Sequence, residues 1–503
     1  MVPLLWRVLP ILVLLISFAL FFYQHDSHKV EGDECTLFPY THYWISSKRI
    51  VTSQGIISGS VEINEGKIVS IVEGYGKQGN SVQQVLDYGE AVVMPGLIDV
   101  HVHLDEPGRT NWEGFVTGTK AAAAGGVTTV VDMPLNNHPT TVSKETLELK
   151  LEAAENKIYV DVGFWGGLIP ENALNTSILE GLLDAGVLGV KSFMCPSGID
   201  DFPMTTIDHI KEGLPVLAKY RRPLIVHAEI QQDSKSPLEL YSNGDPHVYK
   251  TYLDTRPPSW EEAAVKELVD VTKDTVIGGP LEGAHVHIVH LSDSSASLNL
   301  IKEAKRRGDS ISVETCPHYL AFSSEEIPDK DTRYKCSPPI RDALNKEKLW
   351  EAVLDGSIDL LSSDHSPTVP ELKLLKEGDF LKAWGGISSL QFDLPVTWSN
   401  GKKHGLTLEQ LSLLWSQKPA AFAGLELKGA IAIGNHADIV VWQPELEFDL
   451  DDDYPVFLKH PSLSAYMGKR LSGKVIDTFV RGNLVFKDGK HAAAACGVQI
   501  LAK

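Results

Sequence analysis

The sequence lacks the clustered lysines and arginines that a nucleic-acid-binding protein needs. Its 503 residues contain 46 Lys and Arg against 66 Asp and Glu, which gives a formal net charge of -20 at pH 7. Phosphate recognition depends on basic stripes, and none is visible in this sequence. The composition therefore disfavours nucleic acid as a partner and is compatible with a small neutral substrate.

Cysteine is also scarce, and its spacing is not that of a zinc knuckle or of a disulfide framework. The chain has 5 cysteines, they are scattered, and no CxxC pair occurs. We therefore expect all of them to be buried free thiols: Cys35, Cys195, Cys316, Cys336 and Cys496.

A long apolar run marks the start of the chain. Pro3–Tyr23 is apolar except for Arg7 and Ser17, and the mostly polar stretch Gln24–Glu34 follows. This pattern predicts a signal sequence or an uncleaved signal anchor over residues 1–34, although the run is slightly short for a span and no clear A-x-A cleavage site follows. A buried helix is the alternative. In a secretory chain, Asn175-Thr176-Ser177 would be a glycosylation acceptor by pattern.

Both ends of the remaining chain alternate between apolar and polar residues with turn signals between the runs, as β-strands do. Two β-rich flanks around a different middle predict one β-sandwich domain built from both chain ends. The runs near the amino terminus are Trp44–Val51, Ile56–Ile63, Lys67–Val72 and Ala91–Met94, and those near the carboxyl terminus are Ala437–Trp442, Lys474–Arg481 and Asn483–Lys487.

The middle of the chain alternates apolar runs with helix-like stretches such as Trp112–Ala124, Lys144–Asn156, Trp260–Lys273 and Ala296–Arg307. The number and length of the runs predict a (β/α)8 barrel, although a doubly wound sheet would also alternate. We expect sandwich segments over 38–93 and 426–503 and a barrel over 94–425. The apolar runs are Leu97–His103, Thr128–Met133, Tyr159–Gly167, Gly186–Met194, Pro223–Glu229, Ala284–Ser292, Ser310–Tyr319 and Ile358–Asp364.

Potential metal ligands occur at the ends of five of these predicted strands. His101 and His103 are two residues apart, so a strand places both imidazoles on one face. Lys191 interrupts an apolar strand, where a cation is costly unless it is paired or chemically altered. His227 and Asp364 lie at or near the ends of two further strands. Each residue alone would be explained as a core histidine or a helix cap, but five coincidences favour a metal site at the barrel's carboxyl end.

The segment HVHIVH offers three histidines, of which one must be chosen. Alternation places His285 and His287 on the face opposite His290, toward the flanking helices if His290 points inward. His290 also lies nearest the end of the strand. We therefore expect His290 to be the ligand.

The motifs MPGLIDVHVHLDEPGR, GVKSF, IVHAE, IVHLS and SSDHSP, in this order, resemble the cyclic-amidohydrolase branch of the amidohydrolase superfamily. The resemblance covers roughly Trp44 to Lys490. It implies that His101 and His103 bind one divalent metal ion, that His227 and His290 bind a second, and that Lys191, carboxylated by CO2, bridges both. Zinc is the first expectation for the metals and manganese the second. Asp364 would bind the first metal and act as general base and acid while a bridging hydroxide attacks a cyclic amide.

Three groups of this family compete. Dihydroorotases typically carry Arg two residues after the second histidine, where this chain has Asp105, so that group is disfavoured unless Arg109 substitutes. Dihydropyrimidinases (hydantoinases) usually carry HTH and a Tyr shortly after the bridging Lys, and Ser192–Asp200 contains no Tyr. HVHLDEPGRTNWEGF, DMPLNNHPTT and Gly385-Gly386-Ile387-Ser388 instead resemble the allantoinase group, which opens allantoin to allantoate.

A neutral hydantoin with a ureido arm calls for amide and backbone hydrogen bonds. The candidates for substrate contact are Arg109, Asn136, His318, Ser337 and Gly386. Resemblance to plant allantoinases implies the lumen of the endoplasmic reticulum, with membrane contact only through the leader, and a dimer or tetramer. The remaining alternatives are a dihydropyrimidinase and, in another functional class, a barrel scaffold without activity.

Overall fold

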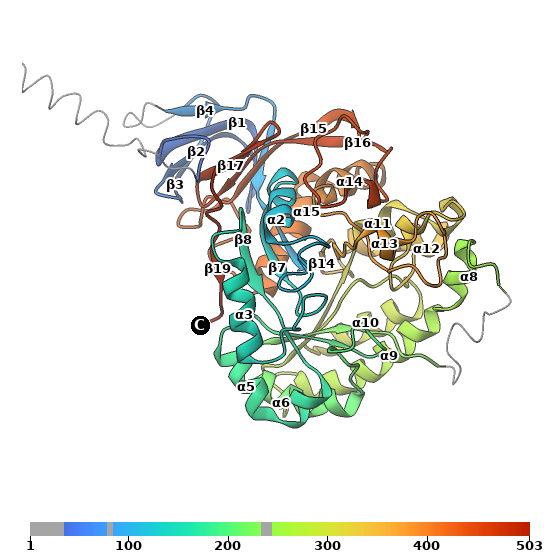
Figure 1. Ribbon diagram of the computed structural model, residues 1–503. Helices are drawn as coiled ribbons and strands as arrows, with labels where there is room; N and C mark the ends of the chain where they lie inside the picture. Colours follow the sequence, from blue (N-terminus) through green and yellow to red (C-terminus); the bar gives the residue numbers. More distant parts are fainter. Residues whose placement is uncertain (1–34, 78–83, 233–243) are drawn as a thin grey trace, which may run out of the picture.

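The computed structural model describes residues 35–77, 84–232 and 244–503 (Figure 1). The predicted leader over residues 1–34 lies outside these residues. Within them, no helix is both long and apolar enough to cross a membrane.

Eight parallel strands form a barrel in the middle of the chain. Neighbouring strands pair in parallel, and bridges from Val102 and Ile387 to His365 join the first strand to the segment after the last. The strands are β6 (Leu97–Val102), β7 (Val127–Asp132), β8 (Asp161–Phe164), β10 (Val190–Phe193), β11 (Pro223–His227), β12 (His285–Ile288), β13 (Ile311–Thr315) and β14 (Leu360–Leu361). A short strand β9 (Gly166–Gly167) continues β8 and pairs with β10.

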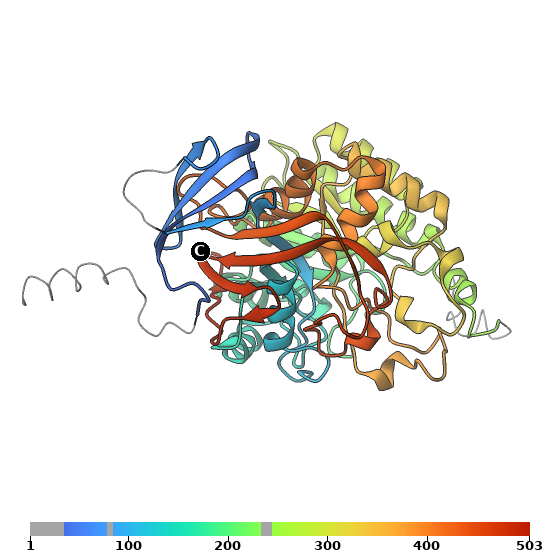
Figure 2. The ribbon, with the colours of Figure 1, turned by 90° about the horizontal axis from the view of Figure 1, so that it is seen from above.

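Helices cover the outside of the barrel (Figures 1 and 2). The longer ones are α2 (Phe115–Ala124), α3 (Lys144–Ala154), α5 (Thr176–Asp184), α6 (Ile207–Tyr220), α9 (Pro258–Thr272), α10 (Ala296–Arg307), α12 (Ala343–Leu354) and α14 (Asp393–Gly401). The shorter ones are α4 (Pro170–Leu174), α8 (Tyr249–Asp254), α11 (Pro317–Ala321), α13 (Pro370–Lys373), α15 (Leu408–Ser412) and α16 (Lys418–Phe422).

Helix α10 shows why the sequence forms these elements. Leu298, Ile301 and Ala304 recur at helical spacing and are buried against the barrel. Three basic residues occupy the last turn, and Gly308 ends the helix at φ 88°, a conformation that glycine adopts without a steric penalty. The predicted helix Ala296–Arg307 has these same bounds.

The remaining strands form one sheet from both chain ends, with the order β18-β17-β16-β15-β5-β1-β2-β3 and β4 paired to β1. Figure 1 shows the blue amino-terminal strands beside the red carboxyl-terminal ones. Strands β5 and β15 join the two halves, where Val93 pairs with Val441. The strands are β1 (His42–Thr52), β2 (Gly55–Asn64), β3 (Lys67–Glu73), β4 (Val85–Asp87), β5 (Val92–Pro95), β15 (Ile439–Asp449), β16 (Arg470–Val480), β17 (Asn483–Lys487) and β18 (Lys490–His491).

This sheet encloses its own hydrophobic cluster, to which Tyr43 and Ile45 come from one end of the chain and Ile439 and Phe479 from the other. The predicted fold, a (β/α)8 barrel with a β-domain built from both ends, is therefore confirmed. The domain limits at residues 93 and 425 stay predictions.

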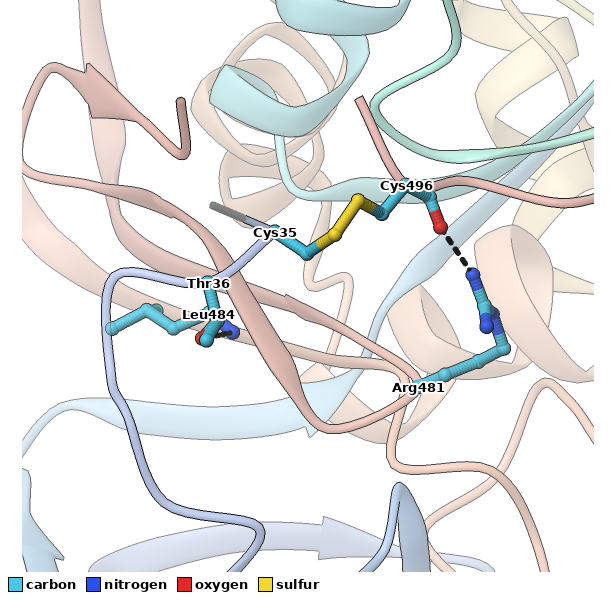
Figure 3. The surroundings of a disulfide bond; sticks show 5 residues. All are labelled: Cys35, Thr36, Arg481, Leu484 and Cys496. Carbon is cyan, nitrogen blue, oxygen red and sulfur yellow. Dashed lines mark hydrogen bonds between the residues drawn. A yellow bond between two sulfur atoms is a disulfide. The ribbon is translucent and has the colours of Figure 1, made fainter. Parts of the chain in front are cut away.

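The expectation for cysteine is wrong for two of the five residues. Cys35 and Cys496 form a disulfide, with Cα atoms 5.5 Å apart and a sequence separation of 461 residues (Figure 3). Sequence spacing could not reveal this pair, because the fold brings the two chain ends together. Cys195, Cys316 and Cys336 are buried free thiols as expected.

Candidate metal centre

The six predicted metal ligands gather at the carboxyl end of the barrel strands. A cavity of about 420 Å³ lies there. Five of the six line it: His101, His103, His227, His290 and Asp364. The sixth, Lys191, is completely buried in β10.

The side chains converge on Asp364. Its Oδ1 lies 3.2 Å from Nε2 of His101 and 3.5 Å from Nε2 of His103. Ligand atoms of His101, His290 and Asp364 all lie within 4.8 Å of one another. The ring of His227 packs edge-on against that of His290, with 4.5 Å between centroids. One small volume thus collects imidazole and carboxylate groups from separate strands.

Burial sets the protonation states of these groups. It lowers the pKa of His227 to about 4 and that of His290 well below its ordinary value, so both imidazoles are neutral near pH 7 and carry a free lone pair. Burial also lowers the pKa of Lys191 to about 8. Burial would raise the pKa of Asp364, but the neighbouring His101 and His103 outweigh this effect and lower the pKa to about 2.

Several buried polar atoms at the centre have no hydrogen-bond partner among the described residues. They are Nζ of Lys191, Nδ1 of His103 and Nδ1 of His290. Such atoms are costly to bury unless they bind something else. Neutral imidazoles, a carboxylate and a lysine able to become an anionic carbamate form a donor set that suits zinc or manganese. The residues present therefore fit a divalent metal centre.

The chain reaches the centre through turns as well as strands. Strand β12 ends at Ile288, and His290 lies two residues later with φ 40°. Because this left-handed turn breaks the alternation, the expected orientation of His287 is wrong. His287 does not point toward the outer helices but lies inside the barrel, where its Nε2 is 3.0 Å from Oε2 of Glu314.

The candidates for substrate contact have different placements. Asn136, Ser337 and Gly386 line the cavity, whereas Arg109 and His318 are not among its lining residues. The Arg109 guanidinium donates to the backbone oxygen of Asn136 at 2.7 Å. His318 is completely buried beside Asp364, and burial lowers its pKa to about 4.

Gly386 approaches Ser366 so closely that a Cβ would lie 2.1 Å from the Ser366 carbonyl oxygen. Its backbone N–H donates to the Lys335 carbonyl and its own carbonyl accepts from Lys373 Nζ. The protein itself therefore uses the backbone groups that were expected to contact substrate. Asp105 is completely buried and is not among the residues lining the cavity.

Sequence reasoning missed several residues of the site. Tyr252, Arg256, Lys335 and Trp384 line the cavity. Tyr252 lies in the short helix α8, and the other three come from loops without a recognisable pattern. Two buried carboxylates, Glu229 and Glu314, contact His227 and His101 from behind. The signal for Glu314 was available, since an acidic residue interrupts the apolar run of β13 as Lys191 interrupts β10.

Comparison with known proteins gives one consistent result. Residues 92–485 match the model of the amidohydrolase family, and residues 38–91 match that of the allantoinase composite domain. An allantoinase of Arabidopsis thaliana is 67% identical over 98% of this chain and 97% of that protein. An allantoinase of Streptomyces avermitilis is 41% identical over 89% of this chain and 96% of that protein. The solved L-hydantoinase (dihydropyrimidinase) of Arthrobacter aurescens superposes with a TM-score of 0.82 at 26% identity, covering 91% of this chain and 99% of that one. The chain therefore belongs to the amidohydrolase family, in its allantoinase group.

Proposed function

We propose that this protein hydrolyses the hydantoin ring of allantoin to give allantoate. The observation that carries the proposal is the convergence of four histidines and Asp364 on one cavity, with Lys191 buried in the neighbouring strand β10. The 67% identity to an allantoinase over nearly the whole chain supports allantoin as the substrate.

His101 and His103 would hold one divalent ion and His227 and His290 the other. Lys191, carboxylated on Nζ, would bridge them. This modification turns a buried amine without a partner into an anion with two oxygens, which removes the cost of burying a cation. When bound, the two ions activate water and polarise the scissile carbonyl. Zinc is our first choice and manganese the second.

Asp364 would move the proton of the reaction. With its pKa lowered to about 2, its carboxylate is ionised near neutral pH and can accept a proton from the attacking water. It can then deliver that proton to the leaving amide nitrogen as the ring opens. Its Oδ1 lies 3.2 Å from Nε2 of His101, and Asp364 itself lines the cavity.

The cavity walls would bind the rest of the substrate. Asn136 and Ser337 offer neutral donors and acceptors to a polar, uncharged ligand. The Ser337 hydroxyl is hydrogen-bonded to the Tyr252 hydroxyl at 2.8 Å, which positions its oxygen at the cavity wall. Arg109 and His318 would act on the substrate indirectly. Arg109 would do so by supporting the turn at Asn136.

Dihydropyrimidinase activity is the second candidate, because the similar solved structures include hydantoinases. A panel of allantoin, hydantoin, dihydrouracil and dihydroorotate tests the choice. We expect allantoin to be opened fastest, and faster turnover of dihydrouracil would reassign the substrate. Purified protein that binds no metal and opens none of the four would support an inactive scaffold instead.

We further propose that the protein works in the lumen of the endoplasmic reticulum as a dimer or tetramer. The disulfide between Cys35 and Cys496 supports an oxidising compartment. Contact with a membrane would be through residues 1–34 only. Fractionation with a lumenal marker and light scattering of the purified protein test the two statements separately.

A further inference from the structure

Two buried carboxylates lie directly behind two of the candidate metal-binding histidines. Oε2 of Glu229 is 2.6 Å from Nε2 of His227. Arg256 holds the same carboxylate through its Nε, 3.1 Å from Oε1, and through Nη2. Arginine is always charged, so Glu229 is held as an acceptor and Nε2 of His227 must donate. The lone pair of His227 is therefore on Nδ1.

Glu314 does the same for His101. Its Oε1 is 2.6 Å from Nδ1 of His101, and its Oε2 is 3.0 Å from Nε2 of His287. The lone pair of His101 is then on Nε2, the atom that lies 3.2 Å from Asp364. In both cases the carboxylate selects which ring nitrogen is free to bind a cation.

We propose that Glu229 with Arg256, and Glu314 with His287, are positioning residues of the metal centre, each fixing one histidine of one metal pair. This inference rests on the proposed function. Carboxylates behind ligating histidines fix the tautomer and raise ligand basicity. Because the two carboxylates contact different histidines, removing one carboxylate should weaken the binding of one metal ion and leave the binding of the other unchanged.

Cys195 lies next to this network, and Arg256 Nη2 is 3.7 Å from its sulfur. Cys195, His227 and Glu229 are close enough together to suggest a third metal site. However, both Glu229 oxygens already accept hydrogen bonds from Arg256. We therefore assign this group to the support of His227.

The test measures metal binding and not only activity. Metal-free full-length Glu229→Gln and Glu314→Gln are titrated with Co²⁺ against a chelator, and the visible absorption of the bound cobalt is recorded. Each variant is expected to bind one of its two ions about 10- to 100-fold more weakly, with the spectral component of that site changed.

Glu261→Gln is the matched control. Glu261 is as buried as Glu229 and pairs with Arg341 at 2.6 Å, but it accepts from Ser292 and contacts none of the candidate ligands. It is expected to lower the thermal midpoint and leave both cobalt affinities unchanged. Unchanged affinities in the other two variants, or an equal loss in the control, would overturn the inference. Wild type that binds two ions but does not open allantoin would overturn the proposed function alone.

A separate observation concerns the carboxyl terminus. Its last strand, β19 (Gln499–Ile500), pairs in parallel with barrel strand β8, and the amide of Ala502 donates to the carbonyl of Gly186, before β10. Ile500 and Ala502 pack against the hydrophobic cluster inside the barrel. The tail therefore fills the barrel wall between β8 and β10.

The disulfide ties this tail to the β-domain three residues before β19 begins. Cys496 is bonded to Cys35, and its carbonyl accepts from Arg481 at 2.6 Å (Figure 3). On the Cys35 side, the Leu37 amide donates to the Leu484 carbonyl, and the Leu484 amide donates to the Thr36 hydroxyl. Cys496 is thus held against the turn between β16 and β17, and the residues after Cys35 are held against β17.

We infer that oxidation of Cys35 and Cys496 is a maturation step that anchors the strand completing the barrel wall. The two thiols lose two protons and two electrons to the disulfide of an oxidising thiol–disulfide oxidoreductase, which becomes a dithiol. The bond stabilises the fold because it restricts the unfolded chain and keeps the tail in place.

Thiol counting and a mutant cycle test this second inference. The denatured, unreduced protein is expected to show the three free thiols of the folded chain, and five after reduction. Cys35→Ser, Cys496→Ser and the double variant are expected to share one loss of about 5 °C in thermal midpoint, with faster amide exchange at Val498–Ala502. Cys336→Ser combined with Cys35→Ser is the control, because these residues are not bonded to each other and their losses in thermal midpoint should add. Five thiols before reduction, or additive effects of the bonded pair, would overturn the inference.

Discussion

Oδ1 of Asp364 lies 3.2 Å from Nε2 of His101, the ring nitrogen that Glu314 leaves free. The carboxylate therefore shares the space in which a cation and a water molecule would meet. Asp364 itself follows β14 in a left-handed turn with φ 46°. Such a turn in a non-glycine residue is uncommon and is found where a side chain must be aimed.

Asp364→Asn should abolish most of the activity. The amide is nearly the same size but cannot accept a proton, so we expect kcat for allantoin to fall by about 100- to 10,000-fold. Initial rates and a thermal melt measure the effect. Asp293→Asn is the control, because Asp293 is equally buried but only caps α10 through Ser295 and Ser297. An Asp364→Asn enzyme with more than a tenth of the wild-type kcat would rule out the proton-transfer role.

Lys191→Ala should lose metal and activity together. Removing the bridging group leaves the two sets of imidazoles without a shared anion. Short carboxylic acids such as acetate should restore part of the metal content and part of the activity. Elemental analysis and turnover are the measurements. Lys150→Ala is the control, because Lys150 is as completely buried as Lys191 and its Nζ pairs with Asp132 at 2.6 Å. This variant should not respond to acetate. Full metal content in Lys191→Ala would show that Lys191 does not bridge the metals.

Carboxylation of Lys191 should depend on pH. Only the neutral amine has a lone pair to attack CO2, and burial lowers the pKa of Lys191 from 10.5 to about 8. Below pH 8 the neutral fraction grows about tenfold per pH unit, and above it the fraction levels off. Recovery of activity by metal-free protein, given metal at constant dissolved CO2, should follow this curve. A rate still rising steeply at pH 10 would place the pKa at its ordinary value.

The sequence could predict what local periodicity encodes. Apolar runs located the barrel strands, and His101, Lys191 and Asp364 were recognisable because polar groups at strand ends are unusual. Contacts between distant segments were not accessible. The support of His227 by Arg256 depends on a loop after α8, and the Cys35–Cys496 pair depends on the meeting of the two chain ends. The predicted orientation of the His287 side chain was wrong because a single backbone turn at His290 breaks the alternation of the strand.

Asn175 should carry an N-linked glycan when the protein is made in a secretory pathway. Asn175 lies between α4 and α5, Thr176 and Ser177 begin α5, and all three residues are exposed, so the acceptor triplet is accessible. Asn175→Gln and Ser177→Ala should both remove a glycosidase-sensitive shift in electrophoretic mobility, because the acceptor pattern needs Asn and a hydroxyl two residues later. Thr176→Ala leaves that pattern intact and should keep the shift. Wild-type protein from secreting cells that shows no shift would mean that Asn175 is not modified, while thiol counting would still report independently on the compartment.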